Sequence, residues 1–213
     1  MMDGSSETIR SPARAQWVAV VAVFGAVWGA FEISLGAFLR SVSIPMHGTF
    51  MTGIGIIIML VARRTLSAGG QRGRGAAIAV GVVAAAILPL SVTRGIEQAM
   101  IGILAEAACL ELVLWVGRPG RWRFGLAGLL AALIPLVQLL TVMTVQYGLG
   151  ALSTFRETLL TKQGGERLGL AVFTAGALIG LIAVASAVFG LVCGMLGWSL
   201  AGQILTRLGR KAE

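Results

Sequence analysis

Four glutamates lie inside or beside long apolar stretches of this 213-residue chain, where a charged side chain is costly. They are Glu32, Glu97, Glu106 and Glu111. Moving a charged residue such as Asp to the centre of a membrane helix costs roughly 2.5–3.5 kcal/mol on insertion scales. A carboxylate in such a place is a candidate for binding a cation, for hydrogen bonding to a solute, or for pairing inside the protein.

Helical spacing separates three of these glutamates. Glu97 and Glu106 are nine residues apart, which is about 900° of rotation and places them on opposite helix faces. Glu106 and Glu111 lie roughly 140° apart around the helix, so the three cannot all line one cavity. Glu106, in the apolar stretch Ile103–Ala108, is the strongest ligand candidate; the alternative is a protonated or paired buried carboxyl. We expect Glu111 to reach an arginine near the cytoplasmic end, and Glu97 to lie at the membrane interface.

Other polar side chains accompany these glutamates. His47 is the only histidine; a lone histidine at a helix start is usually solvated or hydrogen-bonded, and as a metal ligand it would need carboxylates or Met46 as partners. Gln98, Gln138 and Gln146 add amide groups. Such an inventory favours a small cationic or hydrogen-bonding ligand that enters from outside. The predicted substrate-binding residues are Glu106, Glu32, Gln138, Gln146, His47 and Glu97.

Familiar catalytic patterns do not occur in the sequence. There is no HExxH zinc motif, and the only aspartate is Asp3, which excludes a Ser-His-Asp triad. The glycine-rich stretch Ser67–Gly75 lacks the GK[ST] ending of a phosphate-binding loop and is interpreted as a flexible linker. Cys109 and Cys193 lie in apolar runs without metal or disulfide spacing. We therefore predict a protein that is not an enzyme, with no metal and no cofactor.

The composition indicates that membrane helices position these polar residues. The chain is 57% hydrophobic and 12% charged, against about 25% charged in soluble domains. Because a membrane helix needs about 20 apolar residues, the chain predicts an all-α integral membrane protein, a six-transmembrane-helix bundle. Its segments are 17–39, 44–62, 75–93, 98–117, 124–147 and 168–198. The membrane domain is expected at 17–206, between cytoplasmic tails at 1–16 and 207–213.

The basic residues predict the orientation of the bundle in the cell (inner) membrane. Of the 17 Lys and Arg residues, most lie at one set of segment ends, and cytoplasmic loops are the ones enriched in such residues. That set is Arg10, Arg14, Arg63, Arg64, Arg72, Arg74, Arg118, Arg121, Arg123, Arg207, Arg210 and Lys211. Both termini are therefore expected in the cytoplasm. The net charge of +8 forms no basic face with interleaved aromatics, so nucleic acid is not an expected partner.

Two further patterns concern surfaces. The outer connection 148–167 carries Leu152, Phe155, Leu159 and Leu160 among polar residues; it is either a plain surface loop or a segment that lies on the membrane or covers a cavity as a lid. Small residues recur at four-residue steps in the first and last segments, which lets helices approach closely, either within the bundle or toward a partner. In the first segment they are Ala22, Ala26 and Ala30, beside Gly25 and Gly29; in the last they are Gly176, Gly180, Gly190 and Gly194.

With this layout, the small-residue first helix and the stretch Gly102–Glu106, the chain resembles the substrate-binding S component of energy-coupling factor (ECF) transporters. The resemblance implies a subunit that captures a vitamin-like or cationic solute in an outer-half pocket. Glu106, Gln138 and Gln146 fall where pocket residues are expected. The first helix would dock, through an alanine stripe matched by Ala22, Ala26 and Ala30, on a membrane scaffold subunit served by two ATPase subunits.

Two other functions stay open at this point. One is a structural or assembly subunit of a larger membrane complex, which would bind no solute of its own. The other is a self-contained channel or permease, which would more often show internal repeats or a broken helix. The sequence has no convincing repeat and no Walker motif, which favours a capture subunit energised by partners.

Overall fold

The computed structural model describes residues 12–42, 47–68, 73–90, 96–116, 120–162 and 173–209, and throughout these ranges the regular structure is helical. The main helices are α1 (Pro12–Ser41), α2 (His47–Ala68), α3 (Ala76–Ile87), α4 (Ile96–Trp115), α5 (Arg121–Ala131), α6 (Ile134–Tyr147), α7 (Ala151–Glu157) and α8 (Ala175–Arg207). Short turns η1 (Leu88–Leu90), η2 (Gly148–Gly150) and η3 (Thr158–Lys162) extend three of them. Most of both predicted tails lies outside the described residues.

Five helical stretches are long and apolar enough to cross a membrane. They are Arg14–Leu39, His47–Ala68, Ile96–Trp115, Arg121–Tyr147 and Ala175–Arg207. In its described part, the predicted segment 75–93 forms the shorter apolar helix Ala76–Leu90. This helix is about 22 Å long at 1.5 Å per residue, whereas a bilayer core is about 30 Å thick. The last helix ends later than predicted, at Arg207. The described residues thus form an all-helical fold of membrane type with five helical stretches of spanning length.

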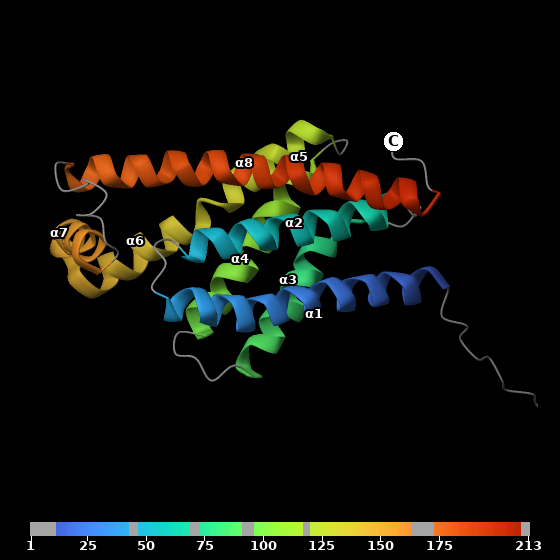
Figure 1. The fold of residues 1–213 in the computed structure, drawn as a ribbon, viewed down its shortest axis with the longest axis horizontal. Coiled ribbons are helices and arrows are strands. Elements are labelled where there is room, and N and C mark those ends of the chain that lie inside the picture. The colour runs from blue at the N-terminus through green and yellow to red at the C-terminus, as the bar shows by residue number, and fades with distance from the viewer. Residues whose placement is uncertain are drawn as a thin grey trace, which may run out of the picture.

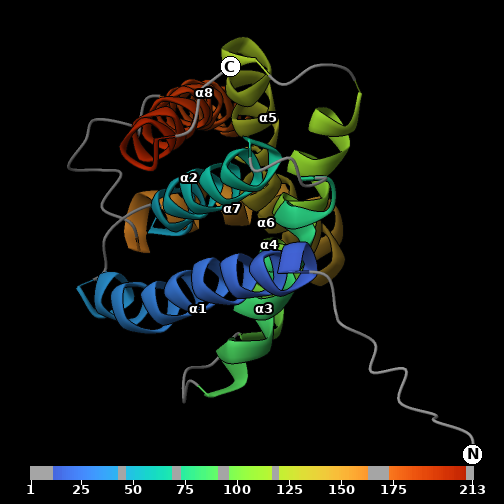
Figure 2. The same ribbon diagram turned by 90° about the vertical axis from the view of Figure 1, so that its right-hand side faces the viewer.

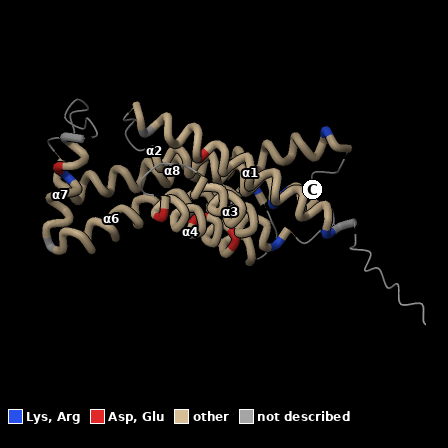
Figure 3. Tube along the Cα trace, turned by 90° about the horizontal axis from the view of Figure 1, so that it is seen from below, with Lys and Arg blue, Asp and Glu red and all other residues tan. Residues whose placement is uncertain are grey.

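Three of the long helices, α1, α2 and α8, run along the long axis of the molecule, whereas α3 and α4 cross them steeply (Figure 1 and Figure 3). α1 begins, and α8 ends, at one end of the bundle, whereas α7 lies at the opposite end (Figure 1). Seen along that axis, α5 and α8 form one side, α1 and α3 the other, and α2 lies between them (Figure 2). Most of the Lys and Arg positions in the described ranges are at the end away from α7 (Figure 3). We refer below to the α7 end and the basic end of the bundle.

Glycines bring α5 and α8 into direct backbone contact. A Cβ atom on Gly128 would lie 2.3 Å from the carbonyl oxygen of Gly190, and one on Gly194 would lie 2.1 Å from that of Phe124. Only glycine permits this approach. The small-residue pattern predicted in the last segment therefore serves internal packing at Gly190 and Gly194, while Gly176 and Gly180 have open space around them.

The small residues of α1 divide between two faces. A Cβ atom on Gly25 would lie 2.5 Å from the Cβ of Val83, and one on Gly29 would lie 3.0 Å from the Cβ of Ile87. These two glycines pack against α3. The expectation that Gly25 and Gly29 belong, with the alanines, to a face that docks a partner is therefore wrong for the two glycines. The alanines of the stripe are exposed: Ala22, Ala26 and Ala30.

The predicted segment 124–147 is not one helix. α5 ends at Ala131, and α6 begins at Ile134 after a two-residue turn. Pro135 lies in the first turn of α6, where its missing N–H does no harm, whereas in a continuous helix it would remove a hydrogen bond and clash with the preceding turn. The break lets α6 leave α5 and run toward the α7 end (Figure 1).

The connection 148–167 is helical in its described part. It forms η2, α7 and η3, and Phe155, Leu159 and Leu160 are buried while Leu152 is exposed. Phe155 and Leu159 pack in a small apolar cluster with Met143 of α6 and with α8. This segment is therefore packed onto the bundle at its α7 end, and is not a plain surface loop.

A buried ion pair joins the helices nearer the basic end. The Nη1 atom of Arg63 pairs with Oε1 of Glu111, and its Nη2 donates to the carbonyl oxygen of Leu114 at 2.9 Å. The Glu111 carboxylate also accepts hydrogen bonds from the backbone N–H groups of Gly75, at 2.8 Å, and Ala77, at 3.3 Å. The prediction that Glu111 has a structural role with an arginine is confirmed.

Candidate functional site

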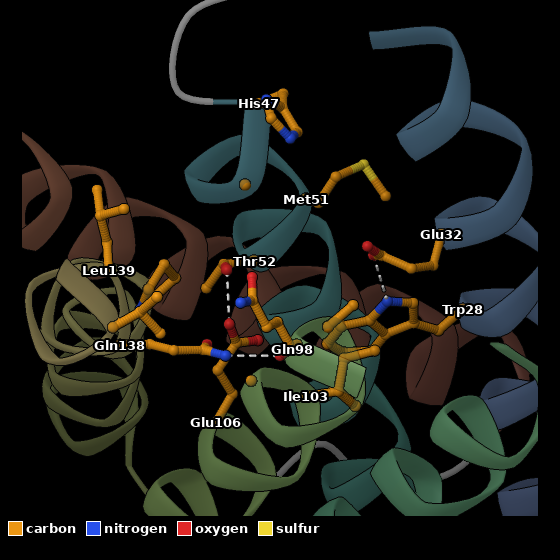
Figure 4. Close-up of a pocket in the computed structure, with 15 residues that line it drawn as sticks. Trp28, Glu32, His47, Met51, Thr52, Gln98, Ile103, Glu106, Gln138 and Leu139 are labelled. Atoms are coloured by element: carbon orange, nitrogen blue, oxygen red, sulfur yellow. Dashed lines mark hydrogen bonds between the residues drawn. The ribbon is translucent and has the colours of Figure 1, made fainter. Parts of the chain in front are cut away.

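A cavity of about 390 Å³ opens between α1, α2, α4 and α6 (Figure 4). It reaches His47 at the start of α2, which is the end of that helix nearer α7 (Figure 1). Its polar lining comes from four helices that are far apart in sequence. The side chains that line it are Trp28, Glu32, His47, Met51, Thr52, Gln98, Ala99, Ile103, Glu106, Pro135, Gln138, Leu139 and Val142, with Gly48 and Gly102. In Figure 4 the carboxyl groups of Glu32 and Glu106 point into the same space from different helices.

Glu106 and Thr52 are the buried polar side chains of the cavity. The side chain of Glu106 on α4 is only 4% exposed. Oε1 accepts a hydrogen bond of 2.6 Å from the Thr52 hydroxyl on α2. Oε2 is buried and has no hydrogen-bond partner among the described residues. Because buried polar atoms are nearly always paired, this oxygen is expected to have a partner, and the described residues supply none.

Glu32 is held from its own helix. The indole Nε1 of Trp28, one helical turn earlier, donates to Glu32 Oε2 at 3.3 Å. Trp28 is 1% exposed and lies flat against Gly55 of α2, where a Cβ atom would come within 1.7 Å of the indole ring. The glycine therefore makes room for the tryptophan, and the tryptophan orients the second carboxylate of the cavity.

The two glutamines connect α4 and α6. Nε2 of Gln138 donates to the backbone oxygen of Gln98 at 2.6 Å. Gly102 leaves space for that amide, because a Cβ atom there would lie 2.9 Å from Gln138 Oε1. This contact positions the amide oxygen of Gln138 on the same side of the cavity as Glu106 (Figure 4).

Four of the six predicted site residues come together in this cavity: Glu106, Glu32, Gln138 and His47. His47, the first residue of α2, lies at the edge of the cavity in Figure 4. Glu97 and Gln146 are exposed and do not line it. Glu97 does not line the cavity because it lies on the opposite face of α4 from Glu106, as the spacing of nine residues indicates. Gln146 lies about two turns beyond Gln138, near the end of α6.

The sequence reasoning missed Trp28, Met51 and Thr52. Met51 and Trp28 are apolar residues in apolar helices, so nothing in their type distinguishes them from core. Thr52 is a common membrane-helix residue, because its hydroxyl can bond to its own helix backbone. One signal was present for Trp28, which precedes Glu32 by four residues and so shares its helix face.

The chemistry of this cavity is mainly that of hydrogen-bond acceptance and negative charge. Two carboxyl groups and an amide oxygen face one space, while the Thr52 hydroxyl and the Trp28 N–H are already donated to the carboxyl groups. In the described part of the chain, no three His, Cys, Asp or Glu side chains come together as a metal site would require. The arrangement suits an organic cation whose N–H groups donate to these acceptors.

No protein-family model, curated protein or solved structure matches the chain. Its function is therefore inferred from the geometry of the cavity.

Proposed function

We propose that this protein binds a small organic cation in the cavity between α1, α2, α4 and α6, and delivers it for import across the membrane. The observation that carries the proposal is Glu106 Oε2, a buried carboxyl oxygen that has no hydrogen-bond partner within the described ranges of the chain. Leaving such a group unpaired costs about 1–3 kcal/mol, and more when it is charged. An ammonium N–H of a bound solute would remove that cost, and Glu32 would add to the attraction.

In the proposed orientation six helical segments cross the cell (inner) membrane, with α3 and η1 as the short sixth. The basic end then faces the cytoplasm, as the excess of Lys and Arg there favours, and the α7 end faces outward. The cavity opens nearer the α7 end, so a solute would enter from outside.

The proposed import role is that of an ECF-type capture subunit. The exposed stripe of Ala22, Ala26 and Ala30 would dock on a transmembrane scaffold subunit that works with two ATPase subunits. Support comes from the flat surface that the alanines give α1, which would let a partner helix approach closely. In this role the protein is not an enzyme and needs no cofactor.

A self-contained permease is a second candidate, and the break between α5 and α6 favours it. Broken helices occur at the binding sites of transporters, and Pro135 beside this break lines the cavity. Uptake of solute by liposomes that contain only this chain would favour the permease. An assembly subunit without solute binding is the third alternative. It does not explain why a carboxyl oxygen of Glu106 is buried with no hydrogen-bond partner among the described residues.

Native mass spectrometry of the purified chain tests the proposal. We expect a co-purifying species of small mass that carries a basic group, and we expect its loss in Glu106→Gln. Glu97→Gln, which alters an exposed glutamate of the same helix, should retain it. A species bound equally by all three proteins, or by none of them, would contradict solute capture through Glu106.

A further inference from the structure

A second cavity, of about 330 Å³, adjoins the first beneath α7 and η3. The two cavities share part of their lining, namely His47, Gly48, Gln98, Pro135 and Leu139. Since the same residues border both spaces, the two cavities lie side by side, and one molecule that reaches past these residues would occupy both. Pro135, at the start of α6, and His47, at the start of α2, lie where the two spaces meet.

The second cavity differs from the first in chemistry. Its side away from the shared residues is formed by Leu136 and Met143 of α6, Phe155 of α7, Leu159 of η3 and Ile182 of α8. Besides the shared residues His47 and Gln98, its polar lining residues are Thr49 and Thr158. None of its lining residues is acidic. The carboxyl groups of Glu32 and Glu106 therefore belong to the first cavity alone, although apolar side chains line both cavities.

From this division we infer that the solute is amphipathic, with a cationic head at Glu106 and an apolar tail of several carbon atoms that lies beneath α7. The inference rests on the proposed function and adds the substrate class. The head satisfies the unpartnered Oε2 atom, while the tail fills an apolar space that would otherwise lack contacts. α7 and η3 then cover the tail, since Phe155 and Leu159 face the cavity and are buried.

The length of the tail gives the inference a quantitative test. Each methylene group moved from water into an apolar site is worth about 0.8 kcal/mol, which corresponds to roughly a fourfold gain in affinity. The probes are ethyl-, propyl-, butyl-, pentyl- and hexylammonium chloride, with the matching n-alkanols to measure partition into lipid. Binding to the full chain in nanodiscs of zwitterionic lipid would be followed by titration calorimetry.

We expect affinity for the alkylammonium ions to rise by roughly fourfold per methylene over the first few members of the series. The alkanols should show no comparable saturable binding. Ile182→Trp, which adds volume to the second cavity alone, should keep the affinity for ethylammonium and remove the gain with length. Met143→Phe tests the same point if the tryptophan variant does not fold. Leu152→Trp, at an exposed position of α7, is the matched control and should behave as the unmodified protein.

Two outcomes separate this inference from the function on which it rests. In the first outcome, ethylammonium binds and Glu106→Gln abolishes that binding, but the affinity does not rise with chain length. The same holds if the affinity still rises with chain length in both Ile182→Trp and Met143→Phe. Either result overturns the tail site and leaves the cation site standing. If no alkylammonium ion binds at any length, the cation-binding function fails as well.

Discussion

The Thr52 hydroxyl on α2 donates a 2.6 Å hydrogen bond to the Glu106 carboxyl on α4, and it is the only described hydrogen-bond partner of that buried group. The contact joins two helices across the floor of the cavity and fixes one carboxyl oxygen so that the other stays available. Holding a binding group in place before the ligand arrives lowers the entropy that binding must overcome.

Thr52→Val should therefore leave both oxygens of Glu106 without partners. We expect the ligand-free protein to lose about 1–3 kcal/mol of stability, the usual cost of an unsatisfied buried group, and to bind solute less tightly. Thr52→Ser keeps the hydroxyl and should restore most of both properties. Thermal unfolding in detergent measures the first effect. Equal melting of the valine and serine variants would show that the bond does not stabilise the bundle.

The ion pair of Arg63 and Glu111 leads to a different expectation. Glu111→Gln would leave the buried guanidinium of Arg63 without its charge partner, which typically costs about 3–5 kcal/mol. The double variant Arg63→Met, Glu111→Leu removes both charges and should recover much of that loss, because apolar replacement of a buried pair is often close to neutral. Solute binding should be similar in all variants that fold, since neither residue lines the cavity. A single variant as stable as the unmodified protein would contradict this account.

The proposed docking face can be tested with two neighbouring residues of α1. Ala26→Leu should leave the isolated protein as stable as before, because Ala26 is exposed, and should weaken its association with the scaffold and ATPase subunits. Gly25→Leu should destabilise the isolated protein, because a side chain there would collide with Val83. The measurements are melting of the purified chain and co-purification with the partner subunits. Loss of folding in Ala26→Leu would place the stripe inside the bundle and end the docking proposal.

The orientation in the membrane is tested by labelling single cysteines in whole cells, in a background without Cys109 and Cys193. Ser153→Cys, on the exposed surface of α7, should react with an impermeant reagent, and Ser67→Cys, near the end of α2, should be protected. The reverse pattern would place the cavity on the cytoplasmic side and contradict capture from outside.

Much of this site follows from the order of residues along single helices. Helical geometry separates Glu97, Glu106 and Glu111 onto different faces, and the structure places one in solvent-exposed surroundings, one in the cavity and one beside Arg63. Periodicity within one helix decides such questions because the rotation per residue is fixed.

What could not be predicted depends on contacts between helices. Gly25 and Ala26 look equally suited to close approach, and only the position of α3 decides which of them is buried. Thr52 is distinguished only by its hydrogen bond to Glu106, which depends on how α4 packs against α2. The break before Pro135 was readable in principle from the proline, but the long apolar stretch around it favoured a continuous helix.

The central claim is that Glu106 binds the solute and does not serve mainly to stabilise the bundle. Glu106→Gln tests it when solute binding and melting are both measured on the same ligand-free preparation, with Glu97→Gln as the control. The account predicts a loss of affinity for an ammonium solute on the order of tenfold or more, since hydrogen bonds to charged groups are worth about 1.5–3 kcal/mol. It predicts unchanged or higher stability, because the variant removes the charge of a buried carboxyl and keeps an oxygen that can accept from Thr52. Unchanged binding together with a lower melting temperature would contradict the account and make Glu106 a structural residue.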